Sequence, residues 1–254
     1  MYKNKKNWKI NLPYFYSQDK FLVIGHRGAP VVYKENTIES FIQAFELGLN
    51  GIELDVQITK DNQIVIFHDW EILEETGNIN KISDVNYSEI KNINSSNTTI
   101  PLLNDLLEIL PKNKFVNIEI KSKKINNKFL LQEVLKIIYR NNKEKYIIIS
   151  SFNPFVLKSL QKMAPAIHTA YLWSSKDPLL LFNSLLWVYI CHPDALHIDI
   201  NDANKKIIDW AHKINMPVLA YTINDAQKLD EAKRMHLDGI FTDNPSLQKE
   251  IYKY

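Results

Sequence analysis

Carboxylate side chains recur with strand spacing inside apolar runs of the sequence. Glu53 and Asp55 stand two residues apart in the run from 51 to 56, so in a β-strand both point to the same side. Glu119 lies late in a second such run, from 115 to 120, and on a neighbouring parallel strand it can point the same way. Three convergent carboxylates suit a hard cation, and ligation by oxygen alone favours Mg²⁺ or Ca²⁺ over Zn²⁺. The sequence therefore predicts a site for one divalent cation, without a choice between Mg²⁺ and Ca²⁺.

Two histidines and two basic side chains follow predicted strands at the same end. His26 and Arg27 follow the first strand, His68 follows a short strand after the second, and Lys121 follows the third. Imidazole exchanges protons near neutral pH, so His26 and His68 are candidate catalytic acid and base. Arg27 and Lys121 are candidates for binding phosphate, since both offset negative charge and guanidinium has the planar geometry for it. Together with a cation, these residues describe a phosphoryl-transfer site; the alternative is a structural network of ion pairs.

The remaining histidines have weaker claims to a chemical role. His197 lies inside a predicted strand, and its role stays open. A single histidine beside a strand is most often structural, and we assign that role to His168, His192, His212 and His236. Nucleotide use is unsupported, because the sequence has neither a Walker loop nor a dinucleotide fingerprint.

Composition excludes several other classes of function. The 31 Lys and Arg residues nearly balance the 29 Asp and Glu residues, which argues against a nucleic-acid partner. The single cysteine, Cys191, excludes an intrachain disulfide and a cysteine-based zinc site. The basic N-terminal segment has no apolar run of signal-peptide type, and the longest apolar stretch, Leu179 to Ile190, is well short of the roughly 20 residues of a membrane span. We expect a cytoplasmic protein without a transmembrane segment.

Short β-branched runs alternate with helical patterns along the whole chain, which is typical of an α/β fold with a parallel sheet. Eight strands are predicted, at 21–25, 51–56, 115–120, 146–150, 169–173, 195–200, 217–222 and 239–242. Helices are predicted at 38–48, 102–110, 128–141, 154–163, 178–190, 204–214 and 225–236, with a last one from 246. This count, and a length of 254 residues, fit a single (β/α)₈ TIM barrel over residues 1–254, since such barrels have about 250 residues. The polar residues above would then lie at the C-terminal mouth, where barrel enzymes place their active sites.

A further strand at 63–67 follows the second one too closely for a parallel crossover, so the two should form a hairpin. A two-residue loop would place His68 on the face of Glu53 and Asp55, whereas a three-residue loop would turn it away.

Seven motifs, in order from about residue 21 to 248, resemble the glycerophosphodiester phosphodiesterase family. They are His26-Arg27-Gly28, Glu35-Asn36-Thr37, Glu53-Leu54-Asp55-Val56, His68-Asp69, Asn117-Ile118-Glu119-Ile120-Lys121, Ser151-Phe152 and Asp238-Gly239-Ile240-Phe241-Thr242-Asp243-Asn244-Pro245. The resemblance implies a barrel of the phosphatidylinositol-phospholipase-C type that uses a divalent metal to cleave glycerophosphodiesters to sn-glycerol 3-phosphate and an alcohol, in glycerol and lipid metabolism. By position it also implies that Glu53, Asp55 and Glu119 hold the metal. His26 and His68 would be general base and acid, and Arg27 and Lys121 would bind phosphate, in agreement with the assignment made above from the residues. The resemblance further implies a small insertion, at about 70–100, as a loop over the mouth.

Three residues depart from the family pattern. Glu74 replaces an arginine, Tyr221 replaces a tryptophan, and Lys34 replaces the proline before Glu35. Tyr221 keeps an aromatic wall and adds a hydroxyl, so it is a candidate residue of the substrate pocket.

Alternatives within and beyond this reaction remain. They are a lysophospholipase D, a lyase of the same barrel type that releases a cyclic phosphate, and a non-catalytic barrel that binds phosphate or phospholipid. Trp187 and Tyr189 in the stretch Leu179 to Ile190 could also touch a membrane surface, although a barrel helix must bury an apolar face in any case. The headgroup, the assignment of acid and base to the histidines and the oligomeric state are not fixed by the sequence.

Overall fold

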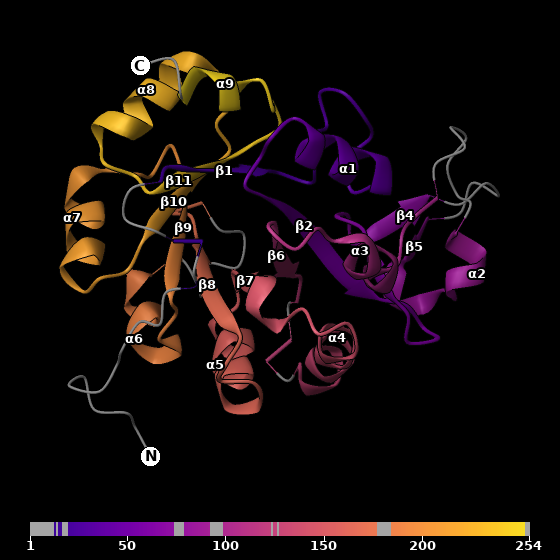
Figure 1. Ribbon diagram of the computed structural model, residues 1–254. Coiled ribbons are helices and arrows are strands. Elements are labelled where there is room, and N and C mark those ends of the chain that lie inside the picture. Colours follow the sequence, from indigo (N-terminus) through magenta and orange to yellow (C-terminus); the bar gives the residue numbers. More distant parts are fainter. Residues whose placement is uncertain are drawn as a thin grey trace.

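The fold is a closed barrel of parallel strands. The computed structural model describes residues 13, 15–16, 20–73, 79–91, 99–122, 124–125, 127–176 and 184–251. Within those residues, eight parallel strands pair in the order β1-β11-β10-β9-β8-β7-β6-β2, and β2 pairs back to β1. The helices form a ring outside the strands (Figure 1). The predicted (β/α)₈ TIM barrel is therefore confirmed.

The elements of the barrel agree closely with the predicted ranges. Its strands are β1 (Leu22–Gly25), β2 (Gly51–Ile58), β6 (Phe115–Ile120), β7 (Ile147–Ser151), β8 (His168–Trp173), β9 (Ala195–Asp199), β10 (Val218–Tyr221) and β11 (Gly239–Thr242). Its helices are α1 (Ile38–Glu46), α3 (Leu103–Ile109), α4 (Lys128–Arg140), α5 (Pro154–Met163), α6 (Val188–Cys191), α7 (Lys205–Lys213), α8 (Ala226–Arg234) and α9 (Leu247–Ile251). Two short 3₁₀ turns are η3 (Glu144–Tyr146) and η5 (Leu185–Trp187).

The helix predicted at 178–190 is the exception. Its described part is η5 followed by the single turn of α6, and residues 177–183 lie outside the described residues. No helix in the described part of the chain is long and apolar enough to cross a membrane.

The barrel interior changes from apolar to polar along the strands. Phe115, near one end, belongs to an apolar cluster inside the barrel, and the ring of Phe15 stacks on it with centroids 4.1 Å apart. Further along β6 the same face carries Asn117 and then Glu119, since successive side chains of a strand alternate between faces. A separate and larger apolar layer lies between the sheet and the helices. The apolar end closes the barrel, and the polar end is left for chemistry.

The hairpin after β2 has a three-residue loop. β3 (Ile64–Ile66) pairs antiparallel with β2, and Thr59 N–H donates to Gln63 O at 3.0 Å, which leaves residues 60–62 in the turn. Strand alternation alone would then turn His68 away from the carboxylates, but the pairing ends one residue before it, where Phe67 N–H donates to Asp55 O at 3.0 Å. His68 lies beyond the strand, so its direction is set by the loop that follows.

The described part of the insertion has secondary structure of its own, whereas the resemblance implied a loop over the mouth. Its described residues form an antiparallel hairpin, β4 (Glu71–Leu73) with β5 (Ile79–Lys81), then a 3₁₀ turn η2 (Ile82–Asp84) and a short helix α2 (Tyr87–Ile90). These elements lie beside β2 and β3 (Figure 1), and they share a small apolar core with Val65 of β3. The shared core holds the insertion against the side of the barrel.

Candidate active site

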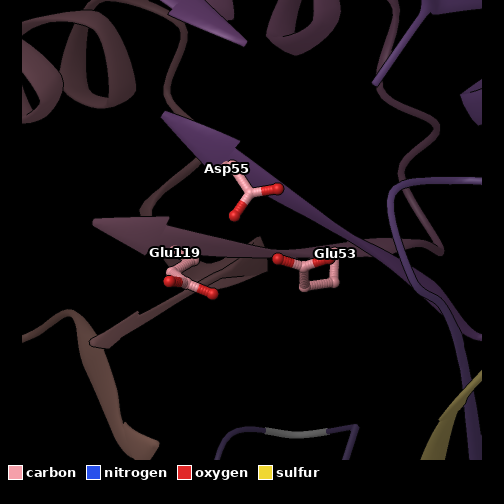
Figure 2. Close-up of side chains that lie close together, drawn as sticks. All are labelled: Glu53, Asp55 and Glu119. Carbon is pink, nitrogen blue, oxygen red and sulfur yellow. The ribbon is translucent and has the colours of Figure 1, made fainter. Parts of the chain in front are cut away.

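Glu53, Asp55 and Glu119 converge at one end of the barrel. The first two come from β2 and the third from β6, and the registered pairing of these strands sets Asp55 beside Glu119. Figure 2 shows the three carboxylates directed into one space. One oxygen from each lies within 4.8 Å of the others, which is the arrangement that could hold a metal ion.

The electrostatics of this cluster fit a bound cation. Burial, followed by the negative charges of Asp55 and Glu119, raises the pKa of Glu53 well above its ordinary value. Burial and the charge of Asp55 raise the pKa of Glu119 to about 8. Carboxylates that repel one another in a buried site are relieved by a positive ion between them. The oxygen-only donor set therefore fits Mg²⁺ or Ca²⁺.

Positive side chains surround Asp55. Lys121 Nζ lies 3.5 Å from one of its oxygens, and Arg27 Nε lies 3.4 Å from the other. Burial raises the pKa of Asp55, but the charges of Lys121, His68 and Arg27 outweigh that effect, and its pKa is lowered. Asn36 Nδ2 donates to the same carboxylate at 3.1 Å. Asp55 thus brings together both predicted phosphate-binding residues and places His68 within electrostatic reach.

A tight turn after β1 holds Arg27 in place. Arg27 has a left-handed backbone (φ 54°), and its N–H donates to Glu53 Oε2 at 3.1 Å. Gly28 follows with φ 97°, and a β-carbon at that position would lie 2.3 Å from Ser40 Oγ. Only glycine fits there, so the turn aims the Arg27 amide at the metal cluster. The guanidinium of Arg27 also donates to both oxygens of Glu35, at 2.9 and 3.0 Å.

A carboxylate and an amide hold His26. Its Nδ1 lies 2.7 Å from Asp243 Oδ1, and Asn224 Nδ2 donates to the other oxygen of Asp243 at 2.6 Å. Burial raises the pKa of Asp243, but the hydrogen bond and charge of His26 outweigh it, so the pKa is lowered and the carboxylate stays ionised. An ionised Asp243 accepts the Nδ1 proton, which leaves Nε2 of His26 for chemistry. Sequence reasoning gave a role to neither Asp243 nor Asn224.

His68 has a similar but more exposed partner. Its Nδ1 lies 2.8 Å from Asp69 Oδ1, and the side chain of Asp69 is 73% exposed. The backbone around it is held by Gln57, whose amide donates to the carbonyls of Phe67 at 3.0 Å and Asp69 at 2.6 Å. Gln57 is two residues beyond Asp55 on the same face of β2, a spacing that could have drawn attention to it.

A cavity of about 230 Å³, lined by both polar and apolar side chains, adjoins His68. Lys34 and Glu35 line one side of it, and His68, Asp69 and Ile100 line another. Lys34, one of the departures from the family pattern, is therefore next to the candidate acid–base residue.

Of the other two departures from the family pattern, the structure describes Tyr221 but not Glu74. The hydroxyl of Tyr221 donates to the carbonyl of Trp173 at 3.0 Å, and its ring meets the edge of Phe152 at 6.2 Å. Glu74 lies outside the described residues.

His197 is buried inside the barrel rather than at the mouth. Its ring packs against Phe241 with centroids 4.7 Å apart, and neither ring nitrogen has a hydrogen-bond partner in the described residues. Burial lowers its pKa to about 3, so the ring is neutral at physiological pH. This histidine is part of the core.

Comparisons with known proteins agree with the geometry. Residues 26–247 match the model of the glycerophosphoryl diester phosphodiesterase family. A glycerophosphodiester phosphodiesterase of Caldanaerobacter subterraneus subsp. tengcongensis is 32% identical over 236 residues, which cover 89% of this chain and 95% of that protein.

Solved structures show the same barrel. A putative glycerophosphoryl diester phosphodiesterase from Silicibacter pomeroyi superimposes with a TM-score of 0.82 at 21% identity, over 97% of this chain and 95% of that one. A phosphodiesterase from Oleispira antarctica, solved in complex with the product sn-glycerol-3-phosphate, superimposes with a TM-score of 0.75 at 26% identity, over 91% of this chain and 96% of that one. The chain is thus a (β/α)₈-barrel enzyme that belongs to the glycerophosphoryl diester phosphodiesterase family.

Proposed function

We propose that this enzyme hydrolyses glycerophosphodiesters to sn-glycerol 3-phosphate and an alcohol, with one divalent cation and two histidines. The observation that carries the proposal is the convergence on Asp55. Its carboxylate joins a three-carboxylate cluster, contacts Arg27 and Lys121, and feels the charge of His68. The relatives named for this reaction support the choice of substrate class.

Glu53, Asp55 and Glu119 would hold the cation, either Mg²⁺ or Ca²⁺. When bound there, the ion supplies positive charge that stabilises the phosphate oxygens in the transition state. The chain contributes to the same task through Arg27 and Lys121, which lie on either side of Asp55. Both basic side chains could bind the monoanionic phosphate group of a phosphodiester.

The two histidines would move protons on either side of the phosphorus. Each has its Nδ1 beside a carboxylate, Asp243 for His26 and Asp69 for His68, so each offers Nε2 to the substrate. One histidine takes the proton of the attacking water or of the neighbouring glycerol hydroxyl, and the other gives a proton to the leaving alcohol. Attack by the glycerol hydroxyl passes through a cyclic phosphate, which water then opens. The cavity beside His68 is placed to hold the leaving alcohol, and Tyr221 is our candidate for a wall of the substrate pocket.

The test is release of glycerol 3-phosphate from a panel of glycerophosphodiesters, with added Mg²⁺, added Ca²⁺ or a chelator. We expect release with a divalent cation, and loss of release with the chelator and in Glu53→Ala. His26→Ala and His68→Ala should each reduce turnover by about a hundredfold or more, the usual contribution of general acid–base catalysis. Near-full turnover in either histidine variant would contradict the two-histidine mechanism.

Product analysis separates the alternatives. A stable cyclic phosphate as the final product would indicate a lyase, and release only from lysophospholipids would indicate a lysophospholipase D. Metal binding without turnover of any diester would indicate a barrel that only binds its ligand. We also propose a cytoplasmic location, because the single cysteine, Cys191, is a free thiol in the core. A role in lipid and glycerol metabolism follows from the proposed substrate class.

A further inference from the structure

Exposed large apolar side chains of the described residues lie on the insertion hairpin, where Ile79 is 65% and Leu73 is 62% exposed, and at the catalytic end of the barrel. Leu186 is 70% exposed, Ile125 is 69% exposed and Val31 is 68% exposed. Val31 lies between β1 and α1, Ile125 between β6 and α4, and Leu186 at the start of the helical segment after β8. Segments that follow the strands also carry the candidate active-site residues, so these three side chains surround the mouth.

The exposed side chains are spread around the mouth rather than gathered on one loop. In the closed strand order, β1 and β8 stand four strands apart, on opposite sides of the barrel. Val32 and Phe129 add two more exposed apolar groups beside the first ones, at 53% and 52%. At the other end of the barrel, Ile109 is only 46% exposed. Single exposed apolar residues are ordinary, but a ring of them around a mouth indicates an interaction surface.

An apolar groove of about 370 Å³ extends this ring outward. Leu185, Leu186 and Tyr189 form one side, and Lys206, Ile207 and Trp210 form the other. Trp210 Nε1 donates to the hydroxyl of Tyr189 at 3.0 Å, which ties the two helical segments together. Tryptophan and tyrosine at the edge of an apolar surface are typical of contact with the boundary between lipid and water.

Lysines accompany the apolar groups on one arc of the mouth. Exposed lysines in the segments that follow β6, β8 and β9 are Lys124, Lys128, Lys176, Lys205 and Lys206. The acidic side chains described there are fewer, among them Asp199, which accepts hydrogen bonds from Asn201, Asp202, which accepts them from Ser174 and Ser175, and Asp209 on α7. The arc is therefore cationic and apolar together, the combination that anionic lipid attracts.

We propose that the arc of the mouth formed by the segments after β6, β8 and β9 docks on an anionic lipid bilayer, with Leu186 and Ile125 entering the headgroup region. The charges favour a bilayer over a second copy of the chain, because a symmetric dimer through this face would bring the lysines of both copies together. Docking in this orientation opens the active site toward lipid headgroups. It is independent of the reaction proposed above.

The test is flotation of the full chain with vesicles of phosphatidylcholine alone, or with part of it replaced by phosphatidylglycerol. We expect binding to the anionic vesicles that weakens as salt is raised. The double variant Leu186→Gln with Ile125→Gln should lower the partition coefficient about tenfold or more. Lys205→Gln and Lys206→Gln should each lower it about fivefold. Ile109→Gln, at the opposite end of the barrel, is the matched control and should bind like the unaltered chain.

Absence of binding to the anionic vesicles, or an equal loss in Ile109→Gln, would overturn the proposal. A dimer in analytical ultracentrifugation that Leu186→Gln dissociates would also overturn it, in favour of a second copy on this face. Hydrolysis of a soluble glycerophosphodiester without vesicles should be unchanged in the double variant. Failure of docking and failure of the proposed reaction are thereby distinguished.

Discussion

At the scale of single residues, the candidate site depends on side chains that orient its histidines. Asp243 accepts from His26 Nδ1 at 2.7 Å and is itself held by Asn224. Asp243→Asn should lower kcat about a hundredfold or more, because an amide can favour the wrong imidazole tautomer and cannot stabilise the imidazolium. Steady-state kinetics on a glycerophosphodiester would measure this.

Asp69→Asn is the matched comparison. Asp69 is 73% exposed, whereas Asp243 is 30% exposed, and solvent weakens the interaction of the more exposed carboxylate with its histidine. We expect a smaller loss, of about tenfold. Equal losses in both variants would mean that burial of the carboxylate does not matter for His26.

The carboxylate cluster makes a second prediction for single residues. Without a cation, Glu53, Asp55 and Glu119 repel one another. Above its pKa of about 8, Glu119 is ionised and Glu119→Gln removes one charge, so at pH 9 the metal-free variant should melt at a higher temperature than the unaltered protein. A saturating divalent cation should raise the Tm of the unaltered protein by about 5 to 10 °C, and that of the variant much less. Differential scanning calorimetry with a chelator and with Mg²⁺ or Ca²⁺ tests both statements, and an equal rise in the two proteins would contradict the assigned ligands.

The sequence predicted which side chains lie in the site better than it predicted which side chains contact one another there. Glu53 and Asp55 were placed on one face because strand alternation is a local rule, and it holds over two residues. The pair of His26 and Asp243 joins residues 217 positions apart, which no local rule connects. Barrel closure brings them together, so only the folded chain reveals the pair.

At the scale of elements, the passage from β2 to β3 shows where local reasoning ends. The hairpin was predicted correctly from its short connection, but the side of His68 was tied to the loop length. The loop has three residues, for which strand alternation alone turns His68 away, and the side-chain contact of His68 Nδ1 is with Asp69, its neighbour in the loop. The backbone pairing with β2 ends at Phe67, and side-chain hydrogen bonds from Gln57 to the carbonyls of Phe67 and Asp69 hold the backbone around His68.

Gln57 should therefore matter for catalysis without touching the substrate. Gln57→Leu removes the amide that binds the carbonyls of Phe67 and Asp69, so we expect kcat to fall by about 10- to 100-fold with little change in KM. Gln161→Leu is the control, because the Gln161 amide likewise donates to a backbone carbonyl, that of His192, away from the histidine pair. Both variants should lose stability in urea unfolding, but only Gln57→Leu should lose activity. Similar kinetics in the two would show that Gln57 has a purely structural role.

At the scale of the whole molecule, the barrel was predictable because its strands and helices repeat; the insertion was expected from the resemblance, but its hairpin and helix were not. The apolar side chains of residues 72 to 90 complete their core only with Val65 of β3 and Ile100. That core is formed by tertiary contact, so the polar and irregular sequence resembled a loop. The same distinction applies to the barrel interior, where apolar residues fill one end and charged residues the other.

His197 lies in that interior and couples it to pH. Its pKa is lowered by burial from an ordinary value of 6.5 to about 3, so the unfolded chain binds a proton that the folded chain does not between these two values. The neutral ring is favourable for folding above pH 6.5, and this advantage is lost as the pH falls toward 3, by at most about 1.4 kcal/mol for each pH unit.

His197→Leu keeps an apolar group against Phe241 and leaves the other histidines in place, so its free energy of unfolding should fall less steeply between pH 6.5 and 5. Urea unfolding of both proteins across this range, with a chelator present throughout, measures the difference. Parallel pH profiles would mean that His197 is protonated within the folded barrel, and that a polar partner reaches it inside the core.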